Sequence, residues 1–264
     1  MKEIRYKDVP IAYSEFNPQG ETVLVLLHGY LESSEIFTPF IEKLDKRIRV
    51  LAMDLPGHGR SDVLPEDHSM ESMAEALQAV LKAAQVTNYW IAGHSMGGYV
   101  ALAFAQAYPE MGNGLCLLHS HPFADSETVK QKRMREIALV EHGKKELIAQ
   151  SNIPNAFADE NLEKLHETVK GAIEIALQTP AEGIIANLKA MKNRNDSSSF
   201  LKRWAKPFLL ILGKNDKYID YNSLFDRLEL PEQAIVVSLE ESGHMGFVEE
   251  PEAVAEVLEK FCRG

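Results

Sequence analysis

The chain has 264 residues, of which 45% are hydrophobic and 25% are charged. That length suits one large domain, or one domain that carries an insertion, and the composition is that of a folded globular protein rather than a disordered one. The net charge of −11 and the pI near 5.3 disfavour negatively charged partners, so we expect the protein to bind neither nucleic acid nor a membrane surface.

The first residues contain no apolar stretch ahead of a small-residue cleavage site, so they do not predict a secretory signal. The longest apolar runs are far shorter than the ~18–20 residues that cross a bilayer. Two cysteines, Cys116 and Cys262, are too few for a disulfide framework. These features predict a soluble cytoplasmic protein and leave its oligomeric state unknown.

The first twenty residues predict an antiparallel hairpin at the edge of a sheet. Six short apolar runs follow with little polar alternation, which is typical of strands buried on both faces. Helices are expected between them, at about 34–45, 70–84, 96–108, 220–229 and 251–261. This alternation predicts an α/β fold with a mostly parallel twisted sheet of about eight strands and helices on both faces. The six runs are Val23–Leu27, Ile48–Met53, Tyr89–Ala92, Leu115–Leu118, Phe208–Leu212 and Ile235–Leu239.

The alternation of strands and helices is interrupted once, between residues 123 and 203. Apolar residues from Leu162 to Leu177 follow the spacing of one buried helix face, and those from Ile184 to Met191 predict a second helix. We therefore expect residues 1–122 and 204–264 to form the core, and residues 123–203 to form an inserted helical cap.

One motif carries the chemistry. A predicted strand ends in Gly93-His94-Ser95-Met96-Gly97, and a helical run follows. In a G-x-S-x-G sequence between a strand and a helix, the serine stands at the apex of a sharp turn where only glycine fits two residues away on either side. The helix that begins after Ser95 also points its backbone N–H groups at a developing oxyanion. This context favours a nucleophile over an ordinary turn serine.

A nucleophilic serine needs a base, and the base needs an orienting acid. In folds with this turn, the chain order is serine, acid, histidine. Asp216 follows the fifth apolar run and His244 follows the sixth, so both leave the sheet at the edge where Ser95 lies and where open α/β sheets bind ligands. We predict Ser95 as the nucleophile, His244 as the base and Asp216 as the acid.

Other polar residues near this edge have different interpretations. Asp220 competes with Asp216 for the role of the acid, but it fits a helix cap better. Asp125, after the strand that precedes the insertion, is a weaker alternative for the same role. His119 and His121 have no carboxylate or cysteine cluster at ligand spacing, so lining of a substrate pocket or plain packing is favoured over metal binding. We expect neither a metal ion nor an organic cofactor.

Residues 22–122 and 204–262 resemble the α/β-hydrolase fold superfamily. The resemblance implies an oxyanion hole made by the backbone N–H groups of Tyr30 and Met96. It also implies structural roles for the other signature histidines, with His28 and His58 fixing loop backbone. The matching signatures, in chain order, are His28-Gly29-Tyr30, Asp54–Ser61, Gly93–Gly98, Gly213–Asp216 and Ser242-Gly243-His244.

The superfamily includes esterases, lipases, carbon–carbon bond hydrolases, acyltransferases and cofactor-free haloperoxidases. The main hypothesis is a carboxylesterase-like serine hydrolase that cleaves a small carboxylic ester or related acyl compound through a Ser95 acyl-enzyme. A dehalogenase or epoxide hydrolase is disfavoured, because those relatives carry aspartate at the position of Ser95. The alternative from another class is a ligand-binding or receptor module on the same fold with little turnover, which fold alone does not exclude.

Overall fold

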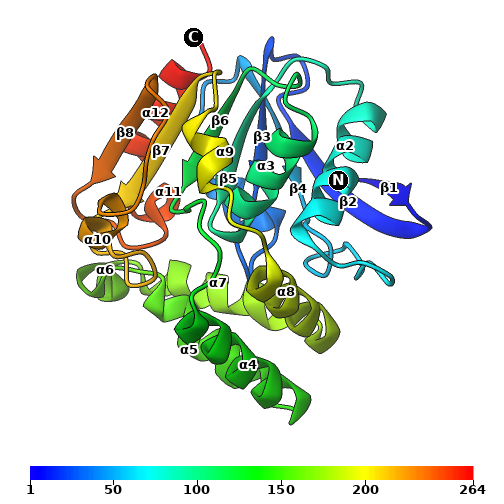
Figure 1. The fold of residues 1–264 in the computed structure, drawn as a ribbon, viewed down its shortest axis with the longest axis vertical. Helices are drawn as coiled ribbons and strands as arrows, with labels where there is room; N and C mark the ends of the chain where they lie inside the picture. Colours follow the sequence, from blue (N-terminus) through cyan, green and yellow to red (C-terminus); the bar gives the residue numbers. More distant parts are fainter. Residues whose placement is uncertain (264) are drawn as a thin grey trace.

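The computed structural model describes residues 1–263, and a twisted sheet with helices on both faces runs through them (Figure 1). Within this range the sheet has eight strands in the order β1-β2-β4-β3-β5-β6-β7-β8. The first two form an antiparallel hairpin, β2 also pairs antiparallel with β4, and the remaining strands pair in parallel. The predicted α/β class and the hairpin at the sheet edge are therefore confirmed. The strands are β1 (Lys2–Tyr6), β2 (Val9–Phe16), β3 (Thr22–Leu27), β4 (Ile48–Met53), β5 (Trp90–His94), β6 (Gly114–Leu118), β7 (Phe208–Gly213) and β8 (Ala234–Leu239).

The six apolar runs coincide with β3 to β8, to within two residues at each end. Central strands such as β5, β6 and β7 are buried along their whole length, because helices cover both faces of a parallel sheet. The prediction of burial on both faces is wrong for β8. This strand lies at the edge of the sheet, and Ile235 and Val236 are 52% and 39% exposed.

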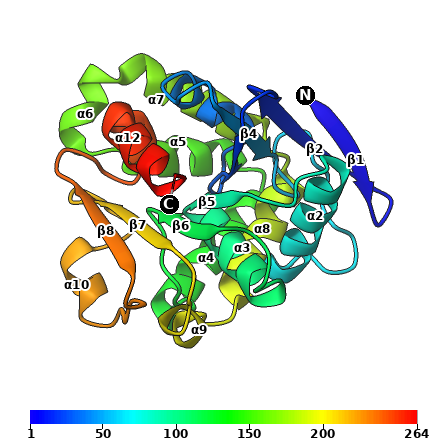
Figure 2. The ribbon, with the colours of Figure 1, turned by 90° about the horizontal axis from the view of Figure 1, so that it is seen from above.

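Helices of the core cover the two faces of the sheet. In the view from above, α2 (Met70–Ala83) and α3 (Met96–Ala107) lie on one face, and α12 (Pro251–Phe261) lies on the other (Figure 2). The predicted helix at 34–45 is shorter, being a 3-10 turn at Ser34–Phe37 followed by α1 (Thr38–Ile41). Two further short helices, α10 (Tyr221–Phe225) and α11 (Gly246–Glu249), follow β7 and β8.

The long segment between β6 and β7 is helical, and most of its helices gather at one end of the sheet (Figure 1). The single helix face expected from Leu162 to Leu177 is divided at Leu165 between two helices. The backbone N–H of Ser197 donates to the carbonyl of Pro122 at 2.7 Å, so the chain leaves the core and returns to it at one point. The helices are α4 (Glu127–Glu141), α5 (Lys145–Asn155), α6 (Asp159–Lys164), α7 (His166–Gln178), α8 (Ala181–Asn193) and α9 (Ser198–Lys202).

Helix α8 docks on the loop that follows β4. The side-chain amide of Asn187 donates to the carbonyl oxygen of Pro56 at 3.0 Å. Gly183, one turn earlier, lies so close to Gly57 that a Cβ there would overlap the Gly57 carbonyl oxygen. Gly57 itself has a φ of +80°, which favours glycine. This contact fixes the helical segment over the edge of the sheet where β3 to β8 end.

Within residues 1–263, no helix combines the length and the apolar character that crossing a membrane requires.

We expect opposite effects from alanine at two helical glycines. Gly183→Ala should lower the free energy of unfolding by about 1–3 kcal/mol, because the new methyl group would push α8 away from Gly57. Gly171→Ala, in α7, should raise it by up to about 1 kcal/mol, because nothing lies within 4 Å of the new methyl group. Urea unfolding of the two variants measures both effects. A stabilised Gly183→Ala variant would contradict the docking of α8 on this loop.

Candidate active site

Ser95 occupies a strained turn between β5 and α3. Its backbone angles are φ 49° and ψ −114°, a conformation that non-glycine residues rarely adopt outside functional sites. The turn is held by its N–H, which donates to the carbonyl of Leu118 at 3.0 Å. A Cβ at Gly93 would overlap the Gly97 carbonyl, and one at Gly97 would overlap the Leu27 carbonyl. The two glycines of the motif therefore allow the close packing that this turn needs.

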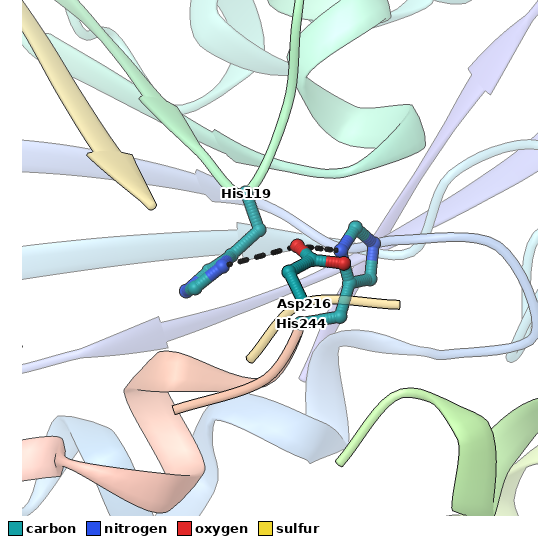
Figure 3. A group of neighbouring side chains, drawn as sticks. All are labelled: His119, Asp216 and His244. Carbon is teal, nitrogen blue, oxygen red and sulfur yellow. Dashed lines mark hydrogen bonds and ion pairs between the residues drawn. The ribbon is translucent and has the colours of Figure 1, made fainter. Parts of the chain in front are cut away.

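An acid–histidine pair lies at the ends of β7 and β8. The Nδ1 atom of His244 is 2.7 Å from Oδ2 of Asp216. Figure 3 marks this contact with a dashed line. The other carboxylate oxygen of Asp216 accepts the backbone N–H groups of Tyr218 and Ile219 at 2.8 and 3.0 Å. With the carboxylate fixed in this way, Nδ1 of His244 carries its proton toward Asp216, and Nε2 keeps a lone pair that can accept another proton.

The Asp216 carboxylate is ionised in this environment. Burial opposes its charge, but the neighbouring His244 and His119 outweigh burial and hold the pKa of Asp216 well below its usual range. The acid therefore stays negatively charged through the neutral pH range, where it can orient an imidazole and stabilise an imidazolium.

His119 contacts the same carboxylate from the opposite side (Figure 3). Its Nδ1 atom lies 3.6 Å from Oδ2 of Asp216, and its Nε2 atom accepts the backbone N–H of Gly246 at 3.1 Å. Burial lowers the pKa of His119 to about 4, so the ring is neutral at neutral pH. The side chain is fully buried and does not line the cavity, in contrast to the expectation that it faces substrate. His121 does line the cavity.

His119, Asp216 and His244 are residue types that also bind metal ions, and their ligand atoms lie within 4.8 Å of one another. The Nδ1 atom of His244 points at Asp216 with the geometry of a hydrogen-bond donor, however, and a donor N–H has no lone pair for an ion. The arrangement fits a hydrogen-bonded acid and base rather than a ligand set.

The two backbone amides expected as oxyanion donors belong to Met96 and Tyr30. Met96 is the first residue of α3, where backbone N–H groups have no partner inside the helix. On the loop after β3, the Gly29 amide donates to Glu32 and the Leu31 amide donates to Nε2 of His58. Between them, the Tyr30 amide has no hydrogen-bond acceptor among residues 1–263.

A cavity of about 630 Å³ connects these groups to the helical segment. Ser95 and His244 lie in its wall, together with side chains from α4, α5 and α8. That volume suits a small organic molecule. The apolar and aromatic part of the lining includes Tyr30, Tyr99, Phe123, Ile153, Met191 and Tyr218, and charged groups such as Arg133 and Glu136 also line it.

The remaining candidates have structural partners. The amide of Leu55 donates to Nε2 of His28 at 2.9 Å, which, with the His58 contact, confirms that these histidines fix loop backbone. Asp220 accepts the Ser223 amide at 2.6 Å and caps α10. Asp125 pairs with Arg133 and Arg194, and it makes no contact with His244.

Two features of this region were not predicted from the sequence. The first is a buried carboxylate, Glu32, which is 4% exposed and contacts His94, directly before Ser95. The second is the strained backbone of Leu31 and His119, with φ values of 64° and 46°, after the ends of β3 and β6. The only sequence signal for Glu32 is a charged residue three positions after Gly29, which on its own predicts an exposed loop side chain.

Comparisons with known proteins identify relatives of this chain. A pimeloyl-[acyl-carrier protein] methyl ester esterase from Xanthomonas oryzae pv. oryzae is 27% identical over 249 residues, which cover 90% of this chain and 94% of that protein. The solved structure of a thermophilic esterase from Thermogutta terrifontis superposes with a TM-score of 0.90 at 27% identity and covers 97% of this chain and 93% of that one. An enol-lactonase from Burkholderia xenovorans, with a TM-score of 0.89 at 19% identity over the full length of both chains, shares the fold.

A sequence model described as "alpha/beta hydrolase fold" matches residues 22–251, a span that runs from β3 through the Ser95 turn to the start of α12. This chain therefore belongs to the α/β-hydrolase fold family.

Proposed function

We propose that this enzyme is a serine hydrolase that cleaves small carboxylic esters through an acyl-enzyme on Ser95. The observation that carries the proposal is the shared cavity. Ser95, in its strained turn, and His244 line the same cavity, and Asp216 holds the His244 ring through the 2.7 Å hydrogen bond. The three residues follow three separate strands. Nucleophile, base and orienting acid are the groups that acyl transfer requires.

In the proposed mechanism, Nε2 of His244 takes the hydroxyl proton of Ser95 as the oxygen attacks the ester carbonyl carbon. The C=O electrons move to oxygen, and the N–H groups of Tyr30 and Met96 stabilise the resulting oxyanion. Collapse of this intermediate breaks the bond to the alcohol, which receives the proton from His244. Water, activated by the same histidine, then attacks the acyl-enzyme and releases the acid. None of these steps calls for a metal ion or an organic cofactor.

Relatives support an ester as the bond that is broken. The Xanthomonas relative and the Thermogutta structure are both named esterases, each 27% identical to this chain. We propose that residues 123–203 act as a cap over the site, because α4, α5 and α8 contribute to the cavity wall. A helical cap excludes water and limits the size of the acyl group.

Ser95→Ala should lower kcat for a p-nitrophenyl ester by about 10⁵-fold or more and should abolish labelling by a fluorophosphonate, because the nucleophile and base act as a unit. The exposed Ser199→Ala is the matched control and should behave like the parent. Thermal unfolding of both variants verifies the fold. A Ser95→Ala variant with parental turnover would overturn the proposed function.

Asp216→Asn should lower kcat by roughly 10³–10⁴-fold, because a neutral amide holds His244 in the wrong tautomer. Asp220→Asn is the comparison variant. Asp220 caps α10 and lines the cavity, but its carboxylate does not pair with the His244 ring, so this variant should lose far less kcat than Asp216→Asn. Initial rates on one ester compare the two variants. A larger loss in Asp220→Asn would show that the acid is assigned to the wrong residue.

The cavity wall predicts the preferred chain length. Among p-nitrophenyl esters, we expect kcat/KM to be highest for short and medium acyl groups and to fall for long ones, because side chains of α4, α5 and α8 wall the cavity and an extended long chain would have to pass them. Initial rates across a graded series of acyl lengths measure this profile. A kcat/KM that keeps rising up to palmitate would contradict the cap as a size limit.

A further inference from the structure

A second buried acid–histidine pair, Glu32 and His94, lies beside the proposed catalytic residues. Glu32 is on the loop after β3, and His94 is the last residue of β5, directly before Ser95. Their side chains are 5% and 1% exposed, and Nδ1 of His94 lies 3.0 Å from Oε2 of Glu32. The proposed acyl-transfer steps use neither side chain.

Both ring nitrogens of His94 face hydrogen-bond acceptors. Nδ1 faces the Glu32 carboxylate, and Nε2 lies 2.8 Å from the backbone carbonyl oxygen of His244. A neutral imidazole has one N–H and one lone pair, so it could satisfy only one of these two acceptors. When Glu32 is ionised both neighbours are acceptors, and the ring satisfies both of them only as an imidazolium that carries two protons.

The surroundings of the pair favour these charges. Burial opposes protonation of His94, but the Glu32 carboxylate outweighs it and raises the pKa of His94 above its ordinary value. Burial likewise opposes ionisation of Glu32, and His94 holds the pKa of that carboxyl below its usual range. Four other titratable residues, each from a different loop, lie near the pair. Burial lowers the pKa of His28 and of His119, so both rings are neutral. Asp216 is ionised, and His244 is the proposed base.

The pair connects three segments of the site. Oε2 of Glu32 also accepts the backbone N–H of Gly29 at 2.7 Å, next to the Tyr30 amide. His94 connects the Ser95 turn to the backbone of His244. The ring centroids of His94 and His244 lie 5.0 Å apart. A Cβ at Gly29 would lie 2.8 Å from Nδ1 of His94, so the pair also accounts for the glycine at this position.

We propose, on the basis of the serine-hydrolase function above, that Glu32 and His94 form a permanent carboxylate–imidazolium pair whose role is to position the base and the oxyanion loop around Ser95. They are positioning residues, because they act through the backbone of His244 and of Gly29. Their loss should lower kcat more than it raises KM, because base and oxyanion geometry matter most in the transition state.

Glu32→Gln tests the pair with little change of shape. A single oxygen, Oε2, accepts from both Gly29 and His94. If the glutamine presents its oxygen there, two acceptors remain, but the negative charge that stabilises the second proton of His94 is gone. His94 then becomes neutral, donates from Nδ1 and turns a lone pair toward the His244 carbonyl. If the glutamine presents its NH₂ group, that group opposes the Gly29 N–H. Glu32→Gln is therefore expected to lose one of the three hydrogen bonds in either orientation.

The first measurement is the protonation state of His94 by ¹H–¹⁵N correlation of histidine ring nitrogens in the full-length protein. The His94→Gln spectrum assigns the resonance among the nine histidines. At pH 8 we expect both His94 nitrogens to be protonated in the parent and only one in Glu32→Gln. A parent His94 with a single proton at pH 8 would overturn the proposal, whatever the activity and whether or not the variant folds.

The second measurement is steady-state kinetics on one p-nitrophenyl ester. Glu32→Gln should lower kcat roughly 10- to 100-fold with a much smaller change in KM, as misplaced reacting groups do. Glu15→Gln removes the carboxylate of a partly buried ion pair with Arg49, between β2 and β4, and should keep the parental kcat. Parental kcat in Glu32→Gln would overturn the positioning role. Persistent turnover in Ser95→Ala would instead overturn the proposed function and leave the protonation result to decide the pair.

Discussion

The close packing of the Ser95 turn against the end of β3 is the constraint on which the rest of the candidate site depends. Gly97 lies against the backbone carbonyls of Leu27 and His28, and Gly93 lies against Gly97 itself. Any side chain at these two positions would push α3 away from β3. The Tyr30 amide follows β3 and the Ser95 hydroxyl precedes α3, so this contact sets the distance between them. Backbone packing at this edge of the sheet thus sets the relative positions of the Ser95 hydroxyl and the Tyr30 amide, independently of the other catalytic side chains.

The positions of the strands could be predicted because central strands of a parallel sheet are buried on both faces and read as unbroken apolar runs. Ile48–Met53 has the same limits in the sequence prediction and in the structure. The edge position of β8 could not be predicted, because exposure of Ile235 depends on which strands pair and not on the apolar run itself. The division into two helices at Leu165 could not be predicted for a related reason. The apolar spacing continues from α6 into α7, because both helices turn apolar residues toward the interior. Such spacing identifies the buried face of a helix but not a change in the direction of its axis.

The order of Ser95, Asp216 and His244 was readable from the sequence because parallel strands end at one edge of the sheet. The surroundings of these residues were not readable. His119 and His121 look equivalent in the sequence, but β6 ends at Leu118 and His119 has a left-handed backbone, so the two side chains separate, one against Asp216 and the other into the cavity. Glu32 could not be recognised as buried, because its partner His94 lies 62 positions along the chain and only the folded loops bring them together.

The hydrogen bond between Ser197 and Pro122 has a consequence for how such a chain can diversify. The two ends of the helical segment meet there, and the buried Asp125 joins Arg133 of its first helix to Arg194 just after its last long helix. Because these contacts hold both ends of the segment in place, we expect the residues between Arg133 and α8 to tolerate insertion, loss or exchange while β6 and β7 keep their parallel pairing. Such changes would alter the part of the cavity wall that the segment supplies without moving the Ser95 turn.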